Sequence, residues 1–226
     1  MRKKVLVSWS TGKDSAWALH ILQQDPDIEV AGLFCTVTET FQRVNMHGVR
    51  IKLLEEQASS ANLPLHIVHI PSSCTDDLYK KIIKDFAGHI RQENNIECFA
   101  FGDLFLEEVR RYREELLFET GIIPLFPIWG IPTHELANRM ISSGLKARIV
   151  CLDPKQLPRK FAGKEFDASF LNEKPAHVDS CAENGEFHTF AFDGPMFNEP
   201  IRVEVGKTVM RDSYCFTDLL PISGNG

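Results

Sequence analysis

The chain has 226 residues, of which 43% are hydrophobic and 25% are charged, and its formal net charge at pH 7 is −6. This length suits one large domain or two small ones, and the composition is that of an ordinary globular protein with a sizeable core. The acidic balance argues against a nucleic-acid partner, because proteins that bind nucleic acids usually carry a basic surface.

The apolar run near the N-terminus, Val5–Val7, is too short for the core of a signal peptide. No stretch approaches the roughly 18 apolar residues of a membrane span. We therefore expect a cytoplasmic protein without a membrane partner. The six cysteines include no C-x-x-C pair, the spacing typical of metal clusters and redox dithiols, so we expect buried thiols in a reducing compartment.

The first half of the chain alternates strand and helix patterns. Short apolar runs predict strands, and apolar residues at helical spacing predict the helices between them. The expected strands are 5–9, 29–37, 65–70 and 97–101, and the expected helices are 13–24, 49–61, 75–94 and 106–120. Strands separated by helices of this length indicate β-α-β crossovers and a Rossmann-like parallel sheet, which is an α/β fold.

The pattern changes near residue 121, where a segment with two prolines and two glycines begins. A helix is expected from Thr133, its predicted N-cap, to the glycine at 144. A strand at 146–153 follows, then irregular chain to about 186, then strand patterns in 187–194 and 201–216. We predict an ATP-binding domain at 1–120 and a smaller α+β domain for an acceptor substrate at 121–226.

A Gly-Lys pair, Gly12-Lys13, lies in a loop of small residues between the first strand and the first helix. The Walker pattern G-x-x-x-x-G-K-[ST] fails here, because Val7 stands at its first glycine and Asp14 follows the lysine. Residues 10–15, Ser-Thr-Gly-Lys-Asp-Ser, instead resemble the S-G-G-x-D-S signature of the PP-loop ATP pyrophosphatases. That family cleaves ATP between the α and β phosphates. The alternative is a strand-to-helix turn that happens to be polar.

The resemblance implies an ATP site in which hydroxyls, backbone N–H groups and the positive end of the helix hold phosphate. The expected nucleotide-binding residues in this region are Ser8, Ser10, Thr11, Gly12, Asp14 and Ser15. Lys13 is expected to add a catalytic point charge, and Asp14 to serve a structural role or hold Mg²⁺. Thr11 departs from the signature, which has its first glycine there.

Ligands of parallel sheets bind at the carboxyl ends of the strands, so the loops at 10–15, 38–48 and 102–103 should share one edge. There Gly102 and Asp103 are expected to contact ribose or magnesium, unless they form a simple strand-ending turn. His47 is a candidate for binding the acceptor substrate, or an ordinary surface histidine. The arginines at 110, 111 and 113 could meet phosphate or an acidic substrate, but we interpret them as part of a solvated charged face, because glutamates surround them.

A second unusual stretch, residues 181–197, resembles the G-E-G-G-E-F-E-T stretch of the diphthine–ammonia ligase family, a branch of the PP-loop class. The resemblance also takes in 45–65 and 127–130, and so covers most of the chain. It implies that ATP adenylates a carboxylate and that ammonia then forms an amide. Glu183 and Glu186 are expected to accept a proton or hold ammonium, or else to bridge a tight turn. Asn184, Gly185 and Thr189 are expected near the acceptor.

The stretch departs from the family pattern at three positions, where Ala182, Asn184 and His188 replace Gly, Gly and Glu. ATP use is therefore better supported than the acceptor, which in the family is diphthine, a modified histidine on a translation factor. No room remains for a glutaminase domain, so free ammonium or a separate partner protein is the expected nitrogen source. Three alternatives stay open: a PP-loop enzyme that modifies tRNA, one that modifies another small molecule, and a non-catalytic ATP- or AMP-binding module. Assembly into a homo-oligomer is also a possibility that the sequence leaves open.

Overall fold

The computed structural model describes residues 2–38, 43–44 and 48–222. Its first sheet is built around β1 (Lys3–Ser8) and β2 (Ile28–Thr38), which run parallel to each other. The other parallel strands are β4 (Leu65–Ile70), β5 (Cys98–Ala100) and β6 (Ile123–Leu125). A two-residue strand, β3 (Arg43–Val44), pairs antiparallel with the end of β2. The predicted α/β fold with a parallel sheet is confirmed.

The order of the parallel strands, β4-β2-β1-β5-β6, reverses at β1. The chain first builds outward through β2 and β4, and then crosses to the other side of β1 to build β5 and β6. In open parallel sheets such a reversal separates the loops that leave the two central strands, so a crevice for ligands forms at their carboxyl ends. The crevice is therefore expected between the loops that follow β1 and β5.

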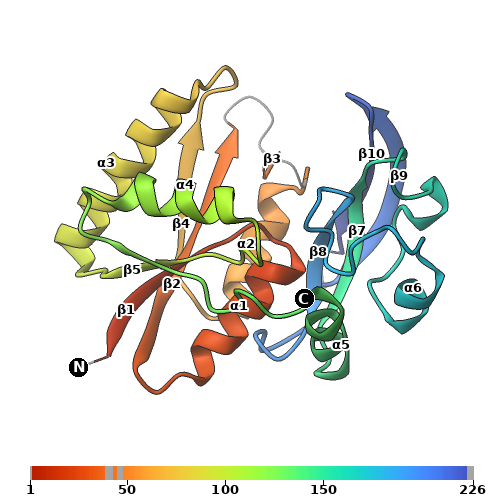
Figure 1. Cartoon of the computed structure of the whole chain (residues 1–226), viewed down its shortest axis with the longest axis horizontal. Coiled ribbons are helices and arrows are strands. Elements are labelled where there is room, and N and C mark those ends of the chain that lie inside the picture. The colour runs from red at the N-terminus through yellow and green to blue at the C-terminus, as the bar shows by residue number, and fades with distance from the viewer. Residues whose placement is uncertain (1, 39–42, 45–47, 223–226) are drawn as a thin grey trace.

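Alternate residues of β1 face opposite sides of the sheet. Val5 and Val7 pack in one core with α1 (Lys13–Gln24) and α2 (Ile51–Ser60). Leu6 packs in a second core with α3 (Asp76–Asn94) and α4 (Glu107–Leu117). The sheet is thus the middle of three layers, and it occupies the half of the molecule that carries the N-terminus (Figure 1).

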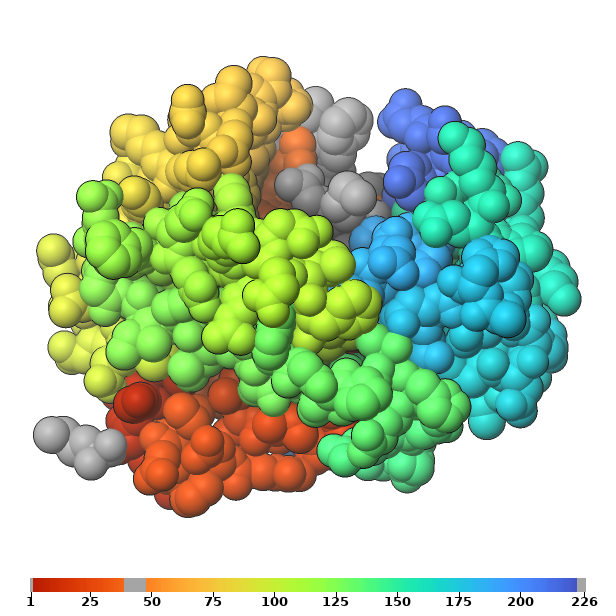
Figure 2. Space-filling model, viewed as in Figure 1, coloured from red at the N-terminus to blue at the C-terminus, as the bar shows by residue number. Residues whose placement is uncertain are grey.

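The second sheet is antiparallel and lies beside α1 and α2 (Figure 1). Its strands, in spatial order, are β8 (Phe187–Asp193), β7 (Lys146–Leu152), β10 (Tyr214–Pro221) and β9 (Val203–Arg211). Buried side chains of β7 and β8 belong to the same hydrophobic core as those of α1 and α2. In Figure 2 the yellow-green atoms after β5 abut the blue atoms before β8, so the two parts of the chain meet at the surface as well.

The region after residue 121 differs from expectation in several details. β6 joins the first sheet, which therefore extends past the predicted boundary at 120. Thr133 is the first residue of α5 (Thr133–Ser142) and not its N-cap, because its hydroxyl donates to Asp179 instead. The segment expected to be irregular contains a short 3-10 helix (Arg159–Phe161) and α6 (Ala168–Glu173). Among the described residues no helix is long and apolar enough to cross a bilayer.

Candidate functional site

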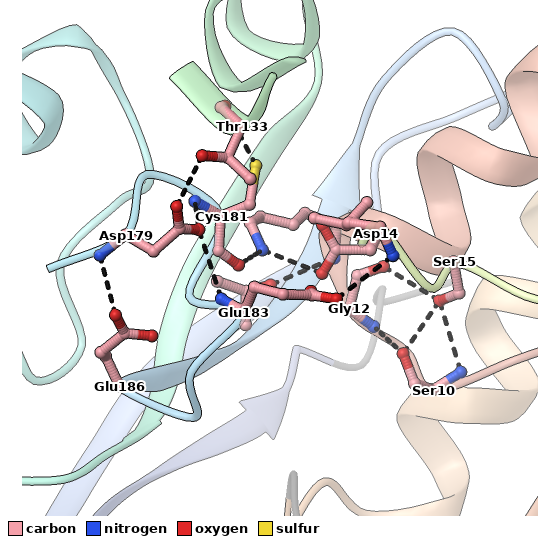
Figure 3. A network of polar contacts seen from close by, with 12 residues as sticks. Ser10, Gly12, Asp14, Ser15, Thr133, Asp179, Cys181, Glu183 and Glu186 are labelled. Atoms are coloured by element: carbon pink, nitrogen blue, oxygen red, sulfur yellow. Dashed lines mark hydrogen bonds and ion pairs between the residues drawn. The ribbon is translucent and has the colours of Figure 1, made fainter. Parts of the chain in front are cut away.

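A cavity of about 260 Å³ lies at the expected crevice. Its walls come from the end of β1 at Ser8, the loop before α1, the chain after β5, one face of α4, and the turn before β8. Segments more than 170 residues apart, such as Ser8 and His188, therefore face the same space. The two stretches that the sequence singled out, around Gly12 and around Glu183, meet here (Figure 3).

The loop between β1 and α1 is closed by its own hydroxyl groups. Ser15 Oγ accepts from Ser10 N at 3.3 Å and lies 3.1 Å from Ser10 Oγ. Ser10 Oγ in turn accepts from Gly12 N at 3.3 Å, and Ser15 Oγ donates to the Gly12 carbonyl at 3.1 Å (Figure 3). These contacts fold the loop into a tight turn. Ser10, Lys13, Asp14 and Ser15 line the cavity, whereas Thr11 and Gly12, also expected to bind the nucleotide, are not in its lining.

Thr11 adopts a left-handed backbone with φ 71°, which explains why the related signature has glycine at this position. The Thr11 carbonyl accepts from Ala191 N at 2.9 Å and from Gln57 Nε2 at 3.0 Å. These two bonds, from β8 and α2, hold the strained turn in place. Ala182 is a second non-glycine residue with positive φ, 66°, at a position where the family has glycine.

The N-terminus of α1 is bound to the second sheet. Gly12 is the N-cap residue and offers no side chain, so the Lys13 N–H bonds instead to Thr189 Oγ1 at 3.1 Å. Thr189 was expected near an acceptor; it does line the cavity, and its hydroxyl also caps the helix. The first turn of α1 is therefore positioned by β8 as well as by β1.

The Lys13 ammonium group is buried, with 2% of its side chain exposed. It donates to the Cys181 carbonyl at 2.5 Å and to Asp14 Oδ2 at 2.9 Å, and it lies 5.5 Å from the ring centres of Phe166 and Phe187. Burial is the largest single influence and disfavours the charged amine, but the attraction and hydrogen bond of Asp14, together with Cys181 and Glu183, outweigh it and raise the pKa of Lys13. Lys13 thus joins the loop to the turn before β8.

The second carboxylate oxygen of Asp14, Oδ1, is buried and has no hydrogen-bond partner among the described residues. Such an oxygen at a cavity wall suits a hard cation, so Asp14 fits the expected magnesium role as a single ligand. The described residues include no group of three or more side chains that could hold a metal. A magnesium ion at Asp14 would therefore take its other ligands from phosphate and water.

Glu186 is the structural support of the turn before β8. Its Oε1 accepts from Asp179 N at 2.8 Å and from Asn184 Nδ2 at 3.3 Å, and its Oε2 accepts from Asn184 N at 3.0 Å. Glu186 is 1% exposed, and neither it nor Asn184 lines the cavity. These contacts fit the turn-bridging alternative for both residues, and a catalytic Glu186 and a substrate-binding Asn184 stay predictions.

Unlike Glu186, Glu183 lines the cavity, as does Gly185. Its Oε1 accepts from Leu104 N at 3.2 Å and Phe105 N at 3.4 Å, which are in the chain after β5. Burial raises the pKa of Glu183 to about 7, although these N–H groups favour the carboxylate. The group is therefore poised to take or release a proton near neutral pH.

Gly102, which follows β5, lies in the cavity wall against the first turn of α1. A Cβ atom there would lie 2.9 Å from both the Asp14 carbonyl carbon and Ser15 N, so glycine is needed for the close approach of β5 and α1. Asp103 lines the cavity and accepts from Arg113 Nε at 3.4 Å. Arg113 also lines the cavity and its side chain is 24% exposed, so this arginine fits the phosphate- or substrate-facing alternative better than the solvated charged face.

Two further cavity residues had no assigned role in the sequence. Burial, assisted by the charge of Lys13, lowers the pKa of His188 to about 4, so this imidazole is neutral at pH 7. Burial raises the pKa of Cys181 to about 12, so its thiol is protonated. Asp179, which accepts from Cys181 N at 2.8 Å and Glu183 N at 3.3 Å, shapes the same turn. His47 lies outside the described residues.

Comparison with known proteins matches the same two parts of the chain. Residues 3–124 match the model of the diphthamide synthase N-terminal domain, and residues 132–219 match that of the diphthamide synthase C-terminal domain. The diphthine–ammonia ligase of Danio rerio is 29% identical over 147 residues, which cover 62% of this chain and 55% of the relative. That of Homo sapiens is 28% identical over 132 residues, covering 56% and 49%.

The chain spans about half the length of the curated relatives it matches. Among solved structures, a U34-tRNA thiolase from Methanococcus maripaludis superposes with a TM-score of 0.40 at 15% identity, over 61% of this chain and 55% of that one. This likeness is too distant to inform function, whereas the two family models together cover nearly the whole sequence. The chain belongs to the diphthamide synthase family.

Proposed function

We propose that this protein is an ATP-dependent ligase that activates a carboxylate as its adenylate and converts it to an amide with ammonia. The observation that carries the proposal is the meeting of the Ser10–Ser15 loop and Glu183 across one cavity. The loop resembles those that bind nucleotide phosphates, and a carboxyl group with a pKa near 7 is suited to proton transfer. Family membership supports this pairing.

ATP is the proposed nucleotide because the loop has the features that phosphate groups need. Ser10 and Ser15 are small residues that line the cavity, and the positive end of α1 begins at Lys13. The cavity of about 260 Å³ is at the lower limit of ordinary ligand sites, which begin at about 300 Å³, so it suits the phosphates better than a whole nucleotide. Asp14 would hold Mg²⁺, which neutralises phosphate charge when bound.

The first step joins the acceptor carboxylate to ATP. A carboxylate oxygen forms a bond to the α-phosphorus while the bond from that phosphorus to the bridging oxygen breaks, and pyrophosphate leaves with the electron pair. The carboxylate is already ionised at neutral pH, so this step needs no base. It needs alignment of the reactants and stabilisation of negative charge, which the loop and the N-terminus of α1 supply.

The second step uses Glu183. The nitrogen of ammonia forms a bond to the carbonyl carbon, the bond from that carbon to the AMP oxygen breaks, and AMP leaves. The nitrogen must also lose a proton, and the Glu183 carboxylate accepts it. With a pKa of about 7, Glu183 is ionised in a large fraction of molecules at pH 7 and still holds a proton well enough to act as the base.

The acceptor is proposed to be a carboxylate, and the diphthine carboxylate of a translation factor is the first candidate because the curated relatives are named for it. The cavity differs from the family pattern where an acceptor would lie. His188, neutral and buried, replaces a glutamate of the pattern, and Ala182 replaces a glycine. A glutamate would repel a negatively charged carboxylate and a neutral imidazole does not, so the replacement at His188 favours an anionic acceptor.

The test measures the two steps separately. Exchange of labelled pyrophosphate into ATP reports the first step, and incorporation of ¹⁵N from ammonium into an amide reports the second. We expect Glu183→Gln to retain carboxylate-dependent exchange and to lose most ¹⁵N incorporation. Binding of ATP without exchange across a panel of carboxylates, including diphthine, would count against a ligase and favour a nucleotide-binding module.

A further inference from the structure

The wall of the cavity carries more acidic than basic side chains, although the proposed ligand, ATP, is negatively charged. Three acidic side chains line the cavity, namely Asp14, Asp103 and Glu183, against two basic ones, Lys13 and Arg113. The Lys13 ammonium is 2% exposed and is already bound to the Cys181 carbonyl and to Asp14. Even with Mg²⁺ at Asp14 and the N-terminus of α1 nearby, a polyanion such as ATP would therefore be stabilised further by a positive side chain other than Lys13 in this space.

Arg113 has the properties of that group. Its guanidinium lies over the ring of Phe101 at 4.8 Å, and its Nε is 3.4 Å from Asp103 Oδ2. A guanidinium carries five N–H donors in a planar fork, and this one long contact engages only the inner nitrogen. Within the described part of the chain, the two terminal nitrogens of Arg113 have no hydrogen-bond partner.

The surroundings hold this fork at the cavity. The side chain is 24% exposed, and it lies between Phe101 and Asp103, both of which also line the cavity. The glycine between these two residues, Gly102, lies against the first turn of α1, so Arg113 and the Ser10–Ser15 loop belong to adjoining walls. A planar fork with both ends available matches the paired oxygens of a phosphate group.

We propose that Arg113 binds the phosphate chain of ATP in this cavity, and that Asp103 and Phe101 position its guanidinium. The inference rests on the proposed function, and it reassigns the phosphate-binding cation from Lys13 to Arg113. Lys13 instead joins the loop to the turn before β8. The phosphates are favoured over the acceptor carboxylate as the ligand, because several negative charges facing three carboxylates need the cation more than a single charge does.

The experiment compares the affinities of ATP, ADP and adenosine for the full chain by calorimetry. Arg113→Gln should weaken ATP binding by about tenfold to a hundredfold, the usual effect of losing hydrogen bonds to a charged group, and leave adenosine binding unchanged. Arg113→Lys keeps the charge without the fork and should recover part of the loss. Arg111→Gln is the matched control, because Arg111 is exposed on the same helix.

The nucleotide series separates the possible failures. An Arg113→Gln variant that binds ATP as tightly as the wild type would overturn the proposal, and so would an equal loss for ATP and adenosine. If Arg113→Gln does not fold, Arg113→Lys decides: wild-type ATP affinity in that folded variant refutes a role for the fork. A wild-type protein that binds no ATP would contradict the proposed function itself.

Discussion

The close approach of Gly102 to α1 makes a sharp test of how the cavity is built. In Gly102→Ala, the new Cβ would meet the Asp14 carbonyl carbon and Ser15 N at 2.9 Å and the Asp14 carbonyl oxygen at 3.0 Å. All three are backbone atoms, which cannot rotate away as the end of a side chain can. Either the end of β5 or the first turn of α1 must shift.

The magnitude follows from two opposing terms. Overpacking of this kind costs about 1–3 kcal/mol, and the loss of glycine's freedom in the unfolded chain returns about 0.4–1 kcal/mol. We therefore expect a net loss of about 1–2 kcal/mol in the free energy of unfolding. For a chain of this size that lowers Tm by about 2–8 °C, since each kcal/mol corresponds to about 2–4 °C. ATP affinity should fall too, because the shift moves the phosphate loop.

Gly88→Ala is the matched control. Gly88 lies inside α3, and a Cβ there would have no heavy atom within 4 Å. Alanine should raise the free energy of unfolding by roughly 0.5–1 kcal/mol through helix propensity, with no effect on ATP binding. The assays are thermal unfolding and calorimetric ATP titration of both variants. If Gly102→Ala were as stable as the wild type and bound ATP normally, the argument that this contact shapes the cavity would be refuted.

Three further predictions concern charged groups of the site. At constant free ammonia, the rate of amide formation should rise as pH increases through about 7, because the base form of Glu183 is its carboxylate. Glu183→Gln should abolish this rise. An unchanged pH profile in the variant would contradict the assignment of Glu183 as the base. Lys13→Met should lower both ATP turnover and the free energy of unfolding. Breaking a buried ion pair costs about 3–5 kcal/mol, and the loss here should be smaller because the Asp14 side chain is 30% exposed. A wild-type Tm in thermal denaturation would argue against the buried link made by Lys13. Glu186→Ala should cost about 1–3 kcal/mol of stability, since it leaves buried N–H groups of the turn without partners. A loss of ¹⁵N incorporation at full stability would instead support a catalytic role for Glu186.

Much of the fold could be predicted from the sequence because local patterns encode it. The apolar runs and helical spacing of the first half predicted the elements of a parallel sheet, and α1 and β4 begin and end where expected. β6 is not predicted because it has only three residues, one of them Pro124, and so carries no usable period. The loop at 10–15 was recognised because its small residues and its place after a strand are local features. The division of the chain into an ATP-binding and an acceptor domain stays a prediction.

The roles of individual side chains in the site were decided by tertiary structure. Glu183 and Glu186 are three residues apart and equivalent in sequence, yet one faces the cavity and the other holds the turn. Lys13 follows the expected loop motif, but its ammonium binds a carbonyl 168 residues away. Arg113 stands in a charged helix, and only the position of β5 shows that it borders the cavity.

The loop at residues 10–15 shows which features depend on the sequence alone and which depend on the tertiary structure. Sequence alone determined that residues 10–15 form a loop of small residues between a strand and a helix, because that depends on neighbouring residues. That this loop binds phosphate stays a prediction. The sequence left Thr11 unexplained, because the partners of Thr11 are Ala191 in β8 and Gln57 in α2. A left-handed turn with a side chain costs about 1–2 kcal/mol, and only contacts from distant parts of the fold can hold it there.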